Sequence, residues 1–92
     1  MNDSRDPIKR AMRARAEAEK VELDAVDAWF REAKAALDAR TDLSDAERRA
    51  AKNALYLEVG KRANQGLGRA KRQNTAPALM EREARERLAA KR

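Results

Sequence analysis

Eight lysine and arginine side chains fall between residues 48 and 72, and they give this stretch the densest charge in the chain. One carboxylate, Glu58, accompanies them. Lysine and arginine neutralise phosphate charge and release counterions, so such a segment favours salt-sensitive, largely sequence-independent binding of nucleic acid. The candidate nucleic-acid-binding residues are Arg48, Arg49, Lys52, Lys61, Arg62, Arg69, Lys71 and Arg72.

The positive charge belongs to one half of the chain. Residues 1–46 carry nine Lys and Arg against eleven Asp and Glu, a net of −2, whereas residues 47–92 carry thirteen against five, a net of +8. Such polarity indicates a nucleic acid or an acidic protein surface as the partner. A membrane surface is less favoured, because few large apolar residues accompany the basic ones. No zinc-finger, RNP or helix-turn-helix pattern is present, so DNA and RNA stay open.

A second hypothesis is a protein–protein interaction module, an adaptor or a small inhibitor, that docks on an acidic protein surface. Its candidate interface residues are Trp29, Leu55, Tyr56 and Val59. Tryptophan and tyrosine are common anchors of interfaces. The alternative for Trp29 is that it closes the core of a helical hairpin against Leu57 or Leu43.

Catalysis is not expected. The chain has no Cys and no His, which excludes thiolate and imidazole metal ligands, cysteine nucleophiles and histidine bases. Its carboxylates are explained by helix capping and by pairing with cations, and no glycine-rich phosphate loop follows a strand. We therefore expect no cofactor, no metal and no small-molecule substrate.

The location and the origin of the protein are expectations from composition. No apolar run approaches the roughly 20 residues of a membrane span, and the N-terminus lacks the apolar core of a signal peptide. A cytoplasmic protein is the default expectation. The bias towards Ala and Arg suggests a bacterial, plasmid or phage origin.

The chain is poor in core-forming residues. Apart from Met1, only 17 side chains are bulky and apolar, while 21 residues are Ala, and the presence of only three aromatic residues argues against a β fold. We expect a single helical domain over residues 1–92 that relies on close Ala packing or on a homo-oligomer, a homodimer in the simplest case.

The first helix is predicted over about residues 6–40, because Asp6 can cap it and Pro7 suits its first position. Arg15 and Glu19, four residues apart, can pair in a polar gap of its apolar stripe. The spacing of that stripe is typical of a helical bundle or a coiled coil. The stripe consists of Ile8, Met12, Ala16, Leu23, Val26, Phe30, Ala33 and Leu37.

The second helix is predicted over about 45–64, because Ser44 and Glu47 form a capping box after a short break. This helix is apolar on two sides. The small side is expected to face the first helix, and it consists of Ala46, Ala50, Ala54 and Leu57. The other side is expected to face another neighbour, and it consists of Ala51, Leu55, Tyr56 and Val59.

A flexible, basic, Gly-containing connection is predicted over 66–75, followed by a helix over about 76–91 that begins at Thr75 and Pro77. The apolar stripe of this last helix is short: Met80, Ala84 and Leu88. The predicted fold is all-α, a long antiparallel hairpin plus a shorter C-terminal helix, arranged as a small three-helix bundle or a dimeric bundle. Since the first helix would outrun the second, its N-terminal end would need the third helix or a second subunit.

Overall fold

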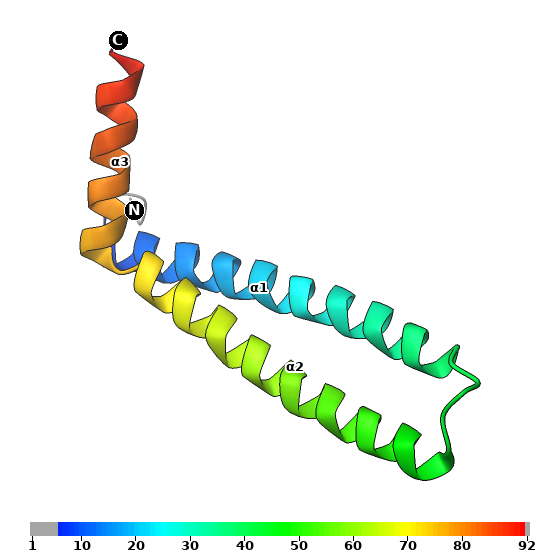
Figure 1. The fold of residues 1–92 in the computed structure, drawn as a ribbon. Helices are drawn as coiled ribbons and strands as arrows, with labels where there is room; N and C mark the ends of the chain where they lie inside the picture. The colour runs from blue at the N-terminus through cyan, green and yellow to red at the C-terminus, as the bar shows by residue number, and fades with distance from the viewer. Residues whose placement is uncertain (1–5, 92) are drawn as a thin grey trace.

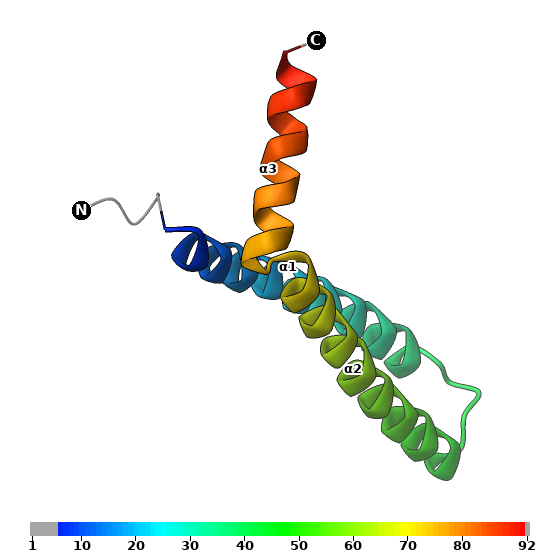
Figure 2. The ribbon, with the colours of Figure 1, turned by 90° about the vertical axis from the view of Figure 1, so that its left-hand side faces the viewer.

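The structure is a computed structural model that describes residues 6–91, and these residues form three helices and no strand. Helix α1 spans Pro7–Asp38, α2 spans Asp45–Gln73 and α3 spans Ala76–Ala90. Helices α1 and α2 form an antiparallel hairpin, and α3 rises from the end opposite their connection (Figure 1 and Figure 2). The molecule is elongated, at 60 × 30 × 20 Å. The predicted all-α hairpin with a shorter C-terminal helix is confirmed.

Each helix begins at the cap that the sequence predicts. The carboxylate of Asp6 accepts the backbone N–H of Ile8 at 2.9 Å. Ser44 and Glu47 form the reciprocal capping box, in which the Ser44 hydroxyl accepts the Glu47 N–H at 3.1 Å. Thr75 caps α3 in the same way. These bonds satisfy N–H groups that a helix N-terminus otherwise leaves without partners.

The predicted connection over 66–75 is wrong, because α2 continues through Gln73. Gly66 and Gly68 lie inside the helix, and no glycine of the described chain has a positive φ. The break falls instead at Asn74, whose buried side chain donates to the carbonyl of Ala70 at 2.8 Å. With 32 and 29 residues, α1 and α2 are nearly equal in length, so the expected overhang of α1 does not exist.

Gly66 stays helical because it lies where α1 and α2 approach most closely. A β-carbon at Gly66 would lie 2.9 Å from Cβ of Glu22, closer than real carbon atoms pack. Ala11 and Ala70 are buried nearby in the same half of the hairpin. Small side chains thus allow the two backbones to approach here, and the helices diverge towards their connection (Figure 1). The contact outweighs the weak helix propensity of glycine.

The side of α2 that faces α1 is not the predicted one. Ala51, Leu55 and Val59 are half-buried on the α1 side, whereas Leu57 is 78% exposed. The small side Ala46, Ala50, Ala54 and Leu57 is exposed throughout. Leu55 and Val59 bury more apolar area than alanines do, and Gly66 lies on their side of the helix, so both features favour this orientation.

The apolar stripe of α1 is correct in its C-terminal half and wrong in its N-terminal half. Val26, Phe30, Ala33 and Leu37 are half-buried. Ile8, Met12, Ala16 and Leu23 are exposed, and Ala11, Ala14, Ala18 and Glu22 are turned inwards instead. Since the two backbones approach closely in this half, there is room for alanine and not for larger side chains. The predicted ion pair between Arg15 and Glu19 is present at 2.7 Å.

Helix α3 contacts the hairpin only through its first two turns, which we call its foot. Leu79 is buried, and the guanidinium of Arg10 in α1 bonds the carboxylate of Glu83 at 2.9 Å. Arg82 donates to the Asn74 side chain at 3.2 Å. The i,i+4 spacing suggests that Glu83 pairs with Arg87 in the same helix. In the structure Glu83 instead pairs with Arg10 of α1. The predicted stripe of Met80, Ala84 and Leu88 is exposed.

Two glycines of α2 provide a matched test of the close approach. A β-carbon at Gly60 would have nothing within 4 Å, so Gly60→Ala should raise the free energy of unfolding by about 0.5–1 kcal/mol through helix propensity. Gly66→Ala should instead lower it by about 1 kcal/mol or more, because the helices must separate. Urea unfolding followed by far-UV circular dichroism at one protein concentration measures both. Equal stabilisation by the two substitutions would contradict the close approach.

Candidate nucleic-acid interface

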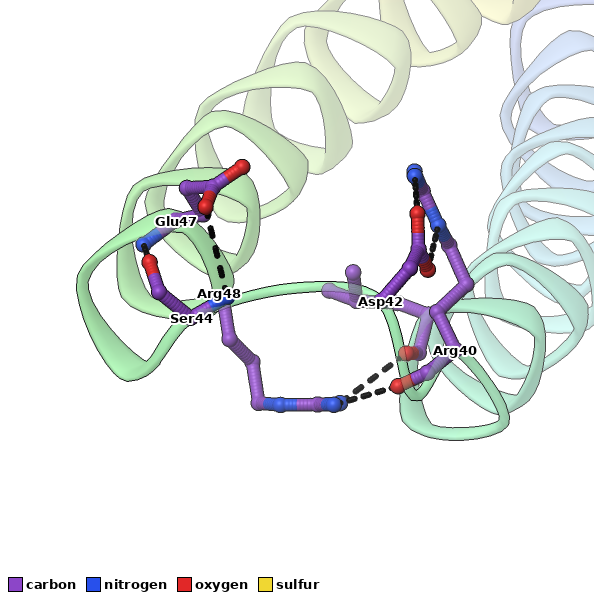
Figure 3. Close-up of polar contacts among 6 residues, drawn as sticks. Arg40, Asp42, Ser44, Glu47 and Arg48 are labelled. Carbon is purple, nitrogen blue, oxygen red and sulfur yellow. Dashed lines mark hydrogen bonds and ion pairs between the residues drawn. The ribbon is translucent and has the colours of Figure 1, made fainter.

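Four of the eight candidate cations are engaged within the hairpin, and Arg48 is the first. It lies in the first turn of α2 and reaches across the connection to the end of α1 (Figure 3). Its guanidinium donates to the carbonyl of Leu37 at 3.0 Å and also to that of Arg40. Helix α1 ends without a basic residue in its last turn, so Arg48 supplies the donors that its free carbonyls need.

The connection holds two further ion pairs. Arg40 and Asp42 form a two-pronged contact, at 2.7 Å for its shorter bond (Figure 3). The hydrogen bonds from Arg40 lower the pKa of Asp42 and raise the pKa of Arg40 itself. Nζ of Lys52, another candidate cation, lies 3.8 Å from the carboxylate of Asp38. Three cations near the tip of the hairpin, Arg40, Arg48 and Lys52, therefore lie beside carboxylates or carbonyls.

The other two engaged cations line a groove along one side of the hairpin. The guanidinium of Arg62 lies 4.0 Å from the centre of the Trp29 ring and bonds Glu58 at 3.1 Å. Arg69 bonds Glu22 of α1 at 2.8 Å. The groove has a volume of about 390 Å³, and its charges alternate in sign. Such a lining does not accumulate the net charge that would attract a phosphate.

The pair of Arg69 and Glu22 changes the acidity of both groups. The side-chain hydrogen bond from Arg69 is the main cause that lowers the pKa of Glu22, and the same bond raises the pKa of Arg69. Desolvation opposes both pKa shifts. Arg69 thus serves the contact between α1 and α2, three residues from Gly66.

The remaining four candidates are exposed, and none makes an ion pair or hydrogen bond with another described residue. They are Arg49, Lys61, Lys71 and Arg72. At 100° per residue they all fall on the half of α2 turned away from α1. Glu58 is on the inner half, so no carboxylate shares the outer half between residues 48 and 73. We call these four residues and the helix surface between them the outer face of α2.

The outer face is otherwise built from small and neutral side chains. Asn53, Gly60, Asn64 and Gly68 separate the cations, and Leu57 is the one large apolar side chain among them. Arg49 and Arg72 are 23 residues apart, which corresponds to roughly 35 Å along a helix. That length is close to one turn of a B-form duplex. Small side chains would let the helix backbone come close to a phosphate backbone.

The candidate interface residues do not form one surface. Leu55 and Val59 are half-buried in the hairpin, and Trp29 is half-buried under Arg62. Tyr56 is 57% exposed, and its ring centre lies 5.6 Å from that of Phe30. Trp29 therefore packs in the hairpin, although against Arg62 rather than against Leu57.

Other kinds of site find little support in the described part of the chain. Nowhere in residues 6–91 do three or more carboxylates gather in a way that could hold a metal ion. None of the three helices combines the length and the apolar character needed to cross a bilayer. Comparison of the chain with models of protein families, with curated proteins and with solved structures finds no match. The function must therefore be inferred from the outer face itself.

The sequence did not separate the four engaged cations from the four exposed ones, because this separation depends on which side of α2 faces α1. The role of Arg48 follows from the end of α1 at Asp38, two residues before the predicted end at Arg40, which leaves the last turn without a basic residue of its own. No signal of this kind identifies Arg69. The predicted stripe includes Leu23 and leaves Glu22 outside it, whereas the structure turns Glu22 inwards, where its carboxylate bonds Arg69.

The lowered pKa of Glu22 predicts a specific acid sensitivity. A carboxylate with a lower pKa in the folded state stabilises the fold above its ordinary pKa of 4.5, and this contribution is lost as the pH falls below that value. Glu22→Gln should therefore lower the melting temperature at pH 7 but change it little near pH 3. Glu17→Gln, at an exposed position of the same helix, is the control and should show no such difference. The measurement is thermal unfolding at several pH values, and a pH-independent effect of Glu22→Gln would contradict the prediction.

Proposed function

We propose that the protein is a small accessory protein that binds nucleic acid through the outer face of α2, as a dimer. The observation that carries the proposal is the set of four cations, Arg49, Lys61, Lys71 and Arg72, on a helix surface without carboxylates. A net charge of +6 supports attraction to a polyanion over longer distances.

Contacts of this kind supply affinity rather than sequence recognition. Each cation that neutralises a phosphate releases a counterion. For B-DNA, four such contacts correspond to a slope of about −3.6 when the logarithm of the binding constant is plotted against the logarithm of the salt concentration. Asn53 and Asn64 are the neutral polar side chains placed to add hydrogen bonds. Stacking of unpaired bases finds few aromatic partners on this face, which favours a duplex over a single strand.

The test compares two double variants of equal charge change. Lys61→Gln with Lys71→Gln removes two cations of the outer face and should weaken duplex binding about tenfold or more at low salt, with a slope smaller by about 2. Lys20→Gln with Lys34→Gln removes two exposed lysines of α1 and is the control. Fluorescence anisotropy with a labelled duplex of about 20 base pairs, over a series of salt concentrations, measures affinity and slope together.

The control separates a site from the effect of net charge. If both double variants lose the same affinity, binding follows the overall charge and the outer face has no special role. If wild-type protein binds the duplex with no dependence on salt, phosphate contact by these lysines is excluded. Running DNA and RNA duplexes side by side decides which nucleic acid is preferred.

A protein partner with an acidic surface is the second candidate function, as an adaptor or a small inhibitor. The observation that favours it is Leu57, which is 78% exposed among the cations of the outer face. Interfaces combine such apolar centres with a polar rim. In contrast to the sequence-based hypothesis, Leu55 and Val59 do not contribute, because they pack inside the hairpin.

Substitution of Leu57 distinguishes the two functions. Leu57→Asp should abolish a protein complex that survives nuclease treatment, because it places a charge in the apolar centre of the contact. For a nucleic-acid complex, the same substitution should lower the affinity by no more than the effect of one added negative charge. Nuclease treatment should then dissociate the complex. Co-purification with and without nuclease, followed by light scattering, provides the measurement.

A further inference from the structure

In the described chain, no hydrogen bond or ion pair joins the last two turns of α3 to α1 or α2, and Arg85 bonds Glu81 of its own helix. From Ala84 to Ala90 every residue is exposed, and Leu88 is 67% exposed. The helix contacts the hairpin through its first two turns, with Glu83 as the last residue bonded to α1. Figure 2 shows α3 standing clear of the hairpin beyond this point. An isolated helix of 15 residues is marginal in water, so such an element needs a neighbour.

The exposed area of the whole chain also requires a partner. A compact monomer of 10.4 kDa exposes about 5400 Å², whereas this chain exposes 7346 Å². Its radius of gyration is 19.5 Å, against about 12 Å for a compact chain of this length. The excess is larger than the roughly 800 Å² that each partner contributes to a standard interface. Leu79 is the one large apolar residue of the described chain that is buried.

We propose that α3 pairs antiparallel with α3 of a second copy of the chain. This inference deepens the dimer included in the proposed function and names its interface. The exposed stripe of α3 is self-complementary, since Met80 and Leu88 lie equally far on either side of Ala84. In an antiparallel pair, Met80 of one copy meets Leu88 of the other and the two Ala84 residues meet at the centre, where their small size lets the helices approach.

The charges beside the stripe fit the same arrangement. Glu81 and Arg85 flank it on one side, and Glu83 and Arg87 flank it on the other. A two-fold axis through Ala84 brings each side against its own copy in the reverse direction, so each Glu lies within one turn of an Arg of the second copy. Within each α3, Glu81 already bonds Arg85 at 2.5 Å, and in the pair each Glu81 also lies within one turn of Arg85 of the second copy.

The hairpin adds apolar area at the foot of α3. In an antiparallel pair, the last turn of one α3 lies beside the foot of the other. Ile8 and Met12 are each 66% exposed at this end of α1. Together with Ala11, Ala76, Arg15 and Lys71 they line a hollow of about 220 Å³. The pairing therefore covers the exposed apolar residues of α3 and places the end of the second helix near this hollow.

The first test is the oligomeric state without nucleic acid. Light scattering should give wild-type protein twice the chain mass of 10.4 kDa, and Leu88→Asp should weaken dimerisation at least about tenfold. Val21→Asp is the matched control, because Val21 is 68% exposed but lies on α1 far from the stripe, and it should stay dimeric. A monomeric wild type at the highest soluble concentration, or a dimer that tolerates Leu88→Asp, would overturn the proposal.

The second test uses the charges. Each single variant also removes the ion pair between Glu81 and Arg85 within α3, and the mixture controls for this loss because neither chain regains that pair. Arg85→Glu and Glu81→Arg should each weaken self-association, because each places like charges across the pair. An equimolar mixture of these two variants should recover dimers, because every Glu then meets an Arg. No recovery on mixing would overturn the antiparallel pairing. Since no nucleic acid is present, loss of the dimer and loss of duplex binding remain separate results.

Discussion

The contact between Gly66 and the β-carbon of Glu22 fixes the orientation of α2, and the remaining features follow from that orientation. A β-carbon at Gly66 would lie 2.9 Å from that of Glu22, so the site has room for a hydrogen and nothing larger. Once Gly66 and Ala70 face α1, the helical period turns Arg62 and Arg69 towards the carboxylates and the Trp29 ring of the groove. The same period turns Lys61, Lys71 and Arg72 to the solvent.

This division of the cations explains why net charge alone overstates the binding surface. A guanidinium that already bonds a carboxylate contributes little field beyond the pair, because the two charges cancel at distances greater than their separation. Lys52, Arg62 and Arg69 are paired with carboxylates in this way, and Arg48 is bonded to carbonyls at the end of α1. The field that a polyanion meets comes instead from the outer face, where Glu58 is turned away.

Local signals in the sequence were sufficient to predict where the helices begin, but not how far α2 extends or which faces pack inwards. Asp6, Ser44 and Thr75 predict their caps because a cap involves residues two or three positions apart. The extent of α2 depends on Gly66, whose low helix propensity is overridden by a contact with Glu22, far away in the sequence. The choice between the two apolar sides of α2 depends on the same contact. The eight cations could therefore be identified from the sequence, but the paired ones could not be separated from the free ones.

The two proposed surfaces lie on different helices, and the fold sets their relation. A two-fold axis across the middle of α3 would place the two hairpins at opposite ends of the paired helices, which are about 22 Å long. Each outer face would then meet nucleic acid without contacting the other. Binding by one face would not require the dimer, whereas simultaneous binding by both would raise the apparent affinity through effective concentration. In the proposed dimer, a chain with so little core would thus use its third helix for assembly and leave the free side of α2 for its partner.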